Sequence, residues 1–170
     1  MKRVLPLLTT LMLPLAVSAQ SFSVRPGLWE HQIQIKSESG RVEFALELAR
    51  TQMALLPPDQ RAMIESVIEA QGLKVDWVNQ RFQNCITEEE ASSGRFRFAE
   101  AGGCTITNVR EQGIATHIDF VCAQGQGSVQ LADGIEYTGQ SSMTLNLGGY
   151  LEQATATHSG QWLGPSCEAQ

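Results

Sequence analysis

The sequence predicts a mainly β protein of the α+β kind, built on a curved antiparallel β-sheet or a partly closed barrel. Short segments in which apolar and polar residues alternate recur through the second half of the chain, separated by glycine-containing turns. A one- or two-helix insertion is predicted near residues 41–72. The cysteines number four, an even count that favours two disulfides in an exported protein.

Residues 1–19 have the pattern of a secretory signal peptide. Lys2 and Arg3 give a positive start, a short apolar stretch follows, and small residues precede Ala19. The apolar stretch is too short to span a bilayer. We expect cleavage after Ala19, which would leave residues 20–170 as a single exported domain in the periplasm.

The charge of the chain limits its partners. It contains 12 basic and 18 acidic residues, a net charge of −6, and removal of the leader would take two basic residues with it. Nucleic acids and anionic membrane surfaces attract basic proteins, so neither is an expected partner. No second apolar run approaches membrane-spanning length, so no integral membrane span is expected.

The first predicted strand covers residues 28–35. Trp29, His31, Ile33 and Ile35 alternate with polar residues and share one face, as in a half-buried strand. His31 is expected near a strand end with its polar tip in water.

The segment 41–72 reads as helical. Residues 42–56 also alternate like a strand, but their alanine, leucine, glutamate and arginine content favours helix. Pro57-Pro58 breaks the chain before a clearer helix, which carries an apolar stripe and ends at Gly72. The stripe either packs on the sheet or forms a lid or partner-binding face. Its residues are Met63, Ile64, Val67 and Ile68.

Two strands are predicted at 74–78 and 81–86, followed by a short helical turn. Thr87 and Glu90 fit a capping box, in which each side chain satisfies a backbone amide of the other residue. The acidic residues 88–90 are therefore read as a helix N-terminus rather than a metal site.

A hairpin is predicted from residues 104–110 and 116–122, turning at Gly113. In the simplest register Ile106 faces Phe120, Asn108 faces Ile118, and His117 faces Val109. Cys104 then lies opposite Cys122, within bridging distance. Four cysteines allow three connectivities; this register favours Cys104–Cys122 and leaves Cys85–Cys167.

The remaining strands are predicted at 128–132, 135–147 and 150–162. Asp133-Gly134 is a strong two-residue hairpin turn, and Gly139 is a candidate bend in the long strand. Short turns between successive strands indicate a meander.

No motif for catalysis survives inspection, and no catalytic residue, metal ligand or cofactor is predicted. The three histidines form no zinc-protease pattern, and no nucleophile elbow or phosphate loop occurs. His117 and Asp119 share a strand face, which is read as solvated, with a general base or metal site as the alternative. A Ser-His-Asp site assembled from distant residues stays open.

Trp29 and Trp162 come from opposite ends of the mature chain. They either pack the core where the first and last strands meet or form an aromatic wall of a ligand pocket. With Met63 and Ile64 they are the candidate ligand-binding residues.

Several segments carry a family resemblance. Residues 25–30 (RPGLWE), 84–89 (NCITEE), 103–106 (GCTI) and 160–167 (GQWLGPSC) resemble, in order, the motifs of bacterial domain-of-unknown-function family 3617. The resemblance covers nearly the whole mature chain, although the segment 56–73 is longer than in compact members. It implies a periplasmic location and a disulfide scaffold, and it supplies no activity, ligand or catalytic residue.

The sequence therefore predicts a non-catalytic binding or interaction module for a small or lipid-like ligand. The alternative is a structural or stress-related envelope protein that acts through protein contacts. An enzyme is the least favoured of the three classes.

Overall fold

The computed structural model describes residues 22–70 and 72–167, so the predicted leader lies outside the described residues. Eight antiparallel strands form one sheet in the order β2-β3-β1-β8-β7-β6-β5-β4. In chain order the elements are β1 Gly27–Ser37, α1 Arg41–Leu55, α2 Pro58–Glu69, β2 Leu73–Asp76, β3 Arg81–Ile86, α3 Glu88–Ser93, α4 Arg97–Ala101, β4 Thr105–Gln112, β5 Ala115–Cys122, β6 Gly125–Ala132, β7 Glu136–Leu147 and β8 Tyr150–Gly164.

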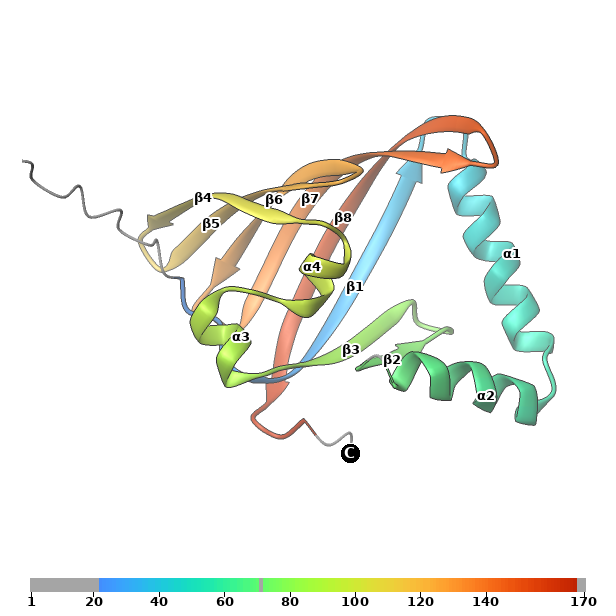
Figure 1. Cartoon of the computed structure of the whole chain (residues 1–170), viewed down its shortest axis with the longest axis horizontal. Coiled ribbons are helices and arrows are strands. Elements are labelled where there is room, and N and C mark those ends of the chain that lie inside the picture. Colours follow the sequence, from blue (N-terminus) through green and yellow to red (C-terminus); the bar gives the residue numbers. More distant parts are fainter. Residues whose placement is uncertain (1–21, 71, 168–170) are drawn as a thin grey trace, which may run out of the picture.

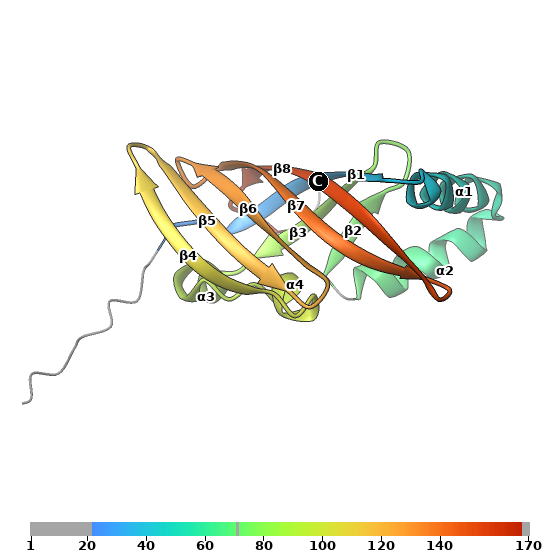
Figure 2. The ribbon, with the colours of Figure 1, turned by 90° about the horizontal axis from the view of Figure 1, so that it is seen from above.

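The sheet curls so that its inner face turns toward α3 and α4, which lie in front of it in Figure 1. Viewed from above, strands β4–β8 present their outer face, and the helices lie below them or beyond their ends (Figure 2). Since β2 and β4 are the two edges, the sheet is curled but open. The predicted curved antiparallel sheet, helical insertion and two disulfides are confirmed.

The first and last strands of the domain pair with each other. β1 lies between β3 and β8, and Trp29 is opposite Trp162 in the β1–β8 ladder. Odd-numbered residues of β1 face inward and even-numbered residues face outward, as the alternation in the sequence predicts. This central position of β1 places its inward side chains at the middle of the curl.

The β4–β5 hairpin departs from the predicted register at one point. Ile106 does face Phe120, but a bulge between Ile106 and Asn108 then shifts the pairing by one residue. Val109 instead of Asn108 faces Ile118, and His117 faces Arg110. The bulge places the apolar Val109 inward, 8% exposed, whereas the simple register would have placed the polar Asn108 there.

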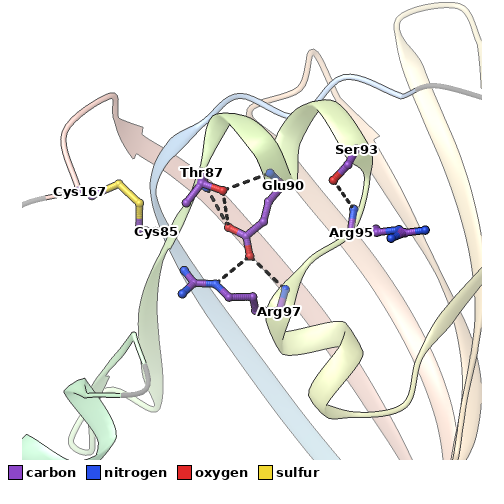
Figure 3. Close-up of polar contacts among 7 residues, drawn as sticks. All are labelled: Cys85, Thr87, Glu90, Ser93, Arg95, Arg97 and Cys167. Atoms are coloured by element: carbon purple, nitrogen blue, oxygen red, sulfur yellow. Dashed lines mark hydrogen bonds and ion pairs between the residues drawn. A yellow bond between two sulfur atoms is a disulfide. The ribbon is translucent and has the colours of Figure 1, made fainter.

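Both predicted disulfides are present. Cys104 bonds to Cys122 at the start of the β4–β5 hairpin, and Cys85 bonds to Cys167. The second bond ties β3 to the segment that follows β8 (Figure 3).

Glu90 holds the short α3 helix in place (Figure 3). The predicted capping box is formed: the Thr87 hydroxyl accepts from the Glu90 amide, and the Glu90 carboxylate accepts from the Thr87 amide. The same carboxylate accepts from the amide and the guanidinium of Arg97. Burial alone would raise the pKa of Glu90, but these hydrogen bonds outweigh it and lower the pKa.

The core lies between this helix and the inner face of the sheet. Trp29, at 1% exposure, is its centre. Apolar side chains from α3, the segment after it, the N-terminal segment and five strands pack together there: Trp29, Ile86, Ala91 and Leu131, with Phe22, Val24, Phe96, Tyr137 and Trp162 around them.

Helices α1 and α2 form a projecting arm (residues 41–69). Figure 1 shows the arm beyond the ends of β1 and β8, on the side away from α3 and α4. The predicted helical insertion is confirmed, and the ambiguous segment is helix rather than strand through Leu55; α2 ends at Glu69, earlier than the predicted end at Gly72. The arm buries little of its own surface: Val42 is the buried residue of α1, and α2 has none.

Candidate functional site

The inner face carries a buried histidine. His31 is 3% exposed, and its ring stacks on Phe82 at 4.8 Å between ring centroids. Its Nδ1 lies 2.8 Å from the Tyr137 hydroxyl and its Nε2 lies 2.6 Å from the Asn84 Oδ1. The expectation that the polar tip of His31 lies in water is wrong. β1 is a central strand of the sheet, and the His31 ring on its inner face is covered by aromatic side chains.

The hydrogen bonds of His31 define its neutral tautomer. The Asn84 oxygen can only accept, so Nε2 carries the proton and donates it there. Nδ1 is then free to accept from the Tyr137 hydroxyl. Burial lowers the pKa of His31 and raises that of Tyr137, so both groups are uncharged near neutral pH.

Gly160 makes the contact between Tyr137 and His31 possible. The three residues lie in one row across β7, β8 and β1. A Cβ on Gly160 would overlap the Tyr137 ring, which therefore lies flat across β8 and extends its hydroxyl to β1.

A second histidine lies further along the inner face. His158 Nε2 is 2.7 Å from the Ser141 hydroxyl, and burial lowers the pKa of His158. In the ladder the pair is diagonal, because His158 faces Gly139 and Ser141 faces Ala156. A serine–histidine contact is the first half of a nucleophile–base–acid arrangement. The inner-facing residues opposite His158 are Ile33 and Gly139, which offer no carboxylate to orient it.

The arm leaves its large apolar side chains in solvent. The exposed fractions run from 39% at Ile64 to 79% at Leu55. At 100° per residue, Phe44, Leu48 and Leu55 lie on one side of α1, while Leu46 lies on the other with the buried Val42. A helix that is apolar on two sides normally has neighbours on both.

Hydrogen bonds fix the base of the arm. The Glu43 carboxylate accepts from the amide and hydroxyl of Ser37, and the Glu152 carboxylate accepts from those of Ser39. These hydrogen bonds lower the pKa of both carboxyl groups. Beyond this anchored base, α1 has no further buried side chain.

The part of the inner face nearest the arm is apolar and incompletely covered. Ile33 and Ile35 on β1 and Met143 and Leu145 on β7 are half-buried. They point inward by the ladder register, and none of them belongs to the core cluster around Trp29.

The outer face is different in character: over the middle of β1, β6, β7 and β8, between Glu30 and Lys36 on β1 and beyond Glu136 on β7, it is polar and carries no charge. We call this region the neutral face. Its outward residues are Gln32, Gln34, Gln126, Ser128, Gln130, Thr138, Gln140, Ser142, Thr144, Gln153, Thr155, Thr157, Ser159 and Gln161.

Two shallow hollows adjoin on the neutral face. One of about 350 Å³ lies over β1, β8 and β7, and one of about 670 Å³ continues over β6 and β5 to Thr107 on β4. Both are lined by Gln140 and Thr157, so together they form one trough across the strands.

The predicted ligand residues fall into two separate places. Trp29 and Trp162 face each other between β1 and β8, with Trp29 in the core and Trp162 half-buried beside it. Met63 and Ile64 lie on the arm, 68% and 39% exposed. Among the described residues no contact joins the two pairs, and a ligand-binding role for them stays a prediction.

His117 and Asp119, which the sequence places together on one strand face, lie on the outer surface of the sheet. Asp119 pairs with the Arg110 guanidinium at 3.0 Å and accepts from the Asn108 amide, on the outward side with His117. Within residues 22–70 and 72–167 no group of histidine, cysteine, aspartate and glutamate is placed to hold a metal ion. In the same ranges no helix is long and apolar enough to cross a membrane.

Sequence reasoning missed the residues that surround the two buried histidines. Asn84, Tyr137 and Ser141 are far from His31 and His158 in sequence, and their contacts depend on the order of strands in the sheet. A signal did exist for one of them, because Gly160 interrupts a strand of larger residues, and such a glycine often marks close approach by another group.

A model of the family described as protein of unknown function (DUF3617) matches residues 24–167. The chain belongs to the DUF3617 family. An uncharacterized protein in the lpd-3 5′ region of Pseudomonas putida is 31% identical over 108 residues, which cover 63% of this chain and 75% of that protein. No solved structure matches the chain.

The opening and closing motifs of this DUF3617 protein meet in the structure. The Trp29 indole donates to the Arg25 carbonyl at 2.8 Å, and the Trp162 indole donates to the Pro26 carbonyl at 2.9 Å. The Arg25 guanidinium lies over the Trp162 ring, 5.3 Å from its centroid. These motifs therefore join the first and last strands of the domain, which are neighbours in the sheet.

Proposed function

We propose that this DUF3617 protein is a non-catalytic binding module of the periplasm that holds a small, lipid-like ligand at the arm. The apolar arm supplies the binding surface, and the adjoining inner face of the sheet supplies a second apolar wall. The buried histidines keep the sheet rigid and take no part in chemistry.

The exposed apolar surface of the arm carries this proposal. Phe44, Leu55 and Met63 are each more than two-thirds exposed, on helices of a chain that has a well-formed core elsewhere. Large apolar side chains left in water in this number favour a site of interaction, because globular domains rarely expose extensive apolar surface. Methionine suits such a site because its flexible thioether adapts to irregular apolar shapes.

The inner face near the arm offers a small apolar area that a ligand of modest size could cover. Ile33, Ile35, Met143 and Leu145 are only half-buried, so each has apolar area left to cover. At about 25 cal/mol per Å², covering such area on binding is favourable for any apolar ligand.

A location outside the cytoplasm is supported by the disulfides and by the leader pattern of residues 1–19. Lipid-like molecules need carriers in an aqueous compartment, because they are poorly soluble there.

Native and denaturing mass spectrometry of protein purified from the periplasm tests the proposal. We expect a native mass above that of the oxidised chain, which falls to the chain mass on denaturation. The double variant Met63→Ser, Ile64→Ser should lose the extra mass and keep its melting temperature, since both side chains are exposed.

Ile114→Ser is the matched control, because Ile114 is 77% exposed in the β4–β5 turn, away from the arm. It should retain the ligand. A clean chain mass for the wild-type protein, or a ligand that survives in the arm variant, would rule the proposal out.

A protein partner is the second candidate, favoured by the two apolar sides of α1. In that case light scattering should show a mass that rises with concentration or with an added envelope extract, and the arm variant should remain monomeric.

A further inference from the structure

The neutral face carries fewer charged residues than we expect for a solvent-exposed surface of this acidic chain. Protein surfaces are commonly about 25–35% charged, and this chain is acidic overall. Yet the outward positions of β1, β6, β7 and β8 around Gln140 are all amides and hydroxyls. Charged residues lie only at its margins: Glu30 pairs with Arg81 at 2.9 Å, Asp119 pairs with Arg110 at 3.0 Å, and Lys36 and Glu136 lie beyond the amides and hydroxyls on β1 and β7.

The trough on this face is long enough to hold an extended ligand. Its lining runs from Gln32 on β1 across β8, β7, β6 and β5 to Thr107 on β4. With neighbouring strands about 4.8 Å apart, that path is on the order of 24 Å long. A compact small molecule would occupy only part of it.

The lining groups match a neutral, hydroxyl-rich chain. Each glutamine amide offers donors and acceptors, and each serine or threonine hydroxyl offers both. In the described part of the chain the Gln34 and Gln140 side chains make no hydrogen bond to protein, so their groups are available. An anionic ligand would find no unpaired cation in the trough, and an apolar ligand would strip water from the amides without replacing it.

We propose that the trough binds an extended neutral glycan through side-chain amides and hydroxyls. An extended peptide is the less favoured occupant, because peptides usually add to a sheet at its edge, where backbone groups are free. The site is separate from the arm and does not depend on the proposed lipid-like ligand.

Affinity electrophoresis of the oxidised protein tests this proposal, with dextran, hydroxyethyl cellulose or a soluble β-glucan in the gel. At least one of them should retard the protein, and 0.5 M salt (roughly a 4 Å screening length) should leave the retardation unchanged. Alginate, an anionic polysaccharide, should not retard it.

Substitutions in the trough provide the decisive comparison. Gln140→Glu and, separately, Thr157→Glu should weaken retardation at least about tenfold, because a carboxylate there must be stripped of water without a cation to pair with. Gln140→Asn keeps the side-chain amide and should retain most of the retardation. Gln112→Glu adds the same charge at the end of β4, outside the trough, and should have no effect.

All four variants change exposed side chains and should melt at the wild-type temperature. The proposal fails if no neutral polysaccharide retards the protein, or if Gln140→Glu is retarded like wild type. Binding of a neutral Ser/Gly-rich peptide without binding of any polysaccharide would assign the trough to a peptide and also overturn it.

Discussion

The Tyr137 hydroxyl reaches His31 Nδ1 at 2.8 Å across an intervening strand. Tyr137 lies on β7 and His31 on β1, with β8 between them, and Gly160 is the residue over which the tyrosine ring passes. Three strands are therefore tied by one side chain, in addition to their backbone ladders. The contact is also the point at which the aromatic core joins the polar groups of the inner face.

Gly160→Ala should destabilise the protein by about 1–3 kcal/mol, the usual range for overpacking. The added methyl group would displace the Tyr137 ring and break its hydrogen bond to His31. Urea unfolding measures the change. In a Tyr137→Ala background the same substitution should have a much smaller effect, and an equal effect in both backgrounds would show that the ring is not the obstacle.

Tyr137→Phe should reduce the free energy of unfolding by about 1–3 kcal/mol, because it removes the hydroxyl that lies 2.8 Å from the buried Nδ1 of His31. Tyr150→Phe is the control, since Tyr150 is 69% exposed. Equal stability of the two variants would contradict the hydrogen bond assigned to His31.

Stability should fall on mild acidification. Burial lowers the folded-state pKa of His31 below its ordinary 6.5, so below pH 6.5 the unfolded chain binds more protons than the folded one. The stability that neutral, buried His31 contributes is fully present above pH 6.5 and is lost as the pH falls toward the folded-state pKa of His31. His158 acts in the same direction. Urea unfolding at several pH values should show this loss, and His31→Gln should reduce it; a flat profile for wild type would contradict the assignment.

Glu90→Ala should destabilise the protein by roughly 1–3 kcal/mol, since the carboxylate serves both the capping box and Arg97. Glu89→Ala removes an exposed carboxylate from the same first turn and should change stability much less. Thermal unfolding monitored by circular dichroism compares the two.

Phe22→Ala should also destabilise, by about 1–2 kcal/mol, because Phe22 is half-buried against Phe96 and the backbone at Gly94. The exposed Ile114 provides a control substitution to alanine. A wild-type melting temperature for Phe22→Ala would show that the N-terminal segment is not part of the core.

The strands, the capping box and the Cys104–Cys122 disulfide follow from local patterns in the sequence, and Cys85–Cys167 was predicted only as the pair that this disulfide leaves; the structure contains all of them. Period-two alternation set the faces of β1, and facing cysteines set the hairpin pairing up to Phe120. The bulge after Ile106 was not predicted, although the three-residue step from Ile106 to Val109 requires an extra residue to keep both inward.

The environment of His31 and the position of the arm depend on information that no local pattern carries. Burial of His31 follows from the placement of β1 between β3 and β8, and the residues that β1 pairs with on β8 are more than a hundred positions away in sequence. An apolar stripe such as Met63–Ile68 indicates that a helix has an apolar side, but not whether the partner belongs to the same chain.

The two disulfides are nested, with the Cys104–Cys122 bond enclosed within the Cys85–Cys167 span. In the proposed export from the N-terminus into an oxidising compartment, the chain presents Cys85 and Cys104 first, and a bond between these two is non-native. Maturation therefore requires either that Cys85 wait as a free thiol until Cys167 arrives or that thiol–disulfide exchange rearrange an early pairing. Acid trapping of newly exported chains, followed by peptide mapping, should find a transient Cys85–Cys104 bond in cells that lack disulfide isomerase, and direct formation of only the native pairs would show that folding precedes oxidation.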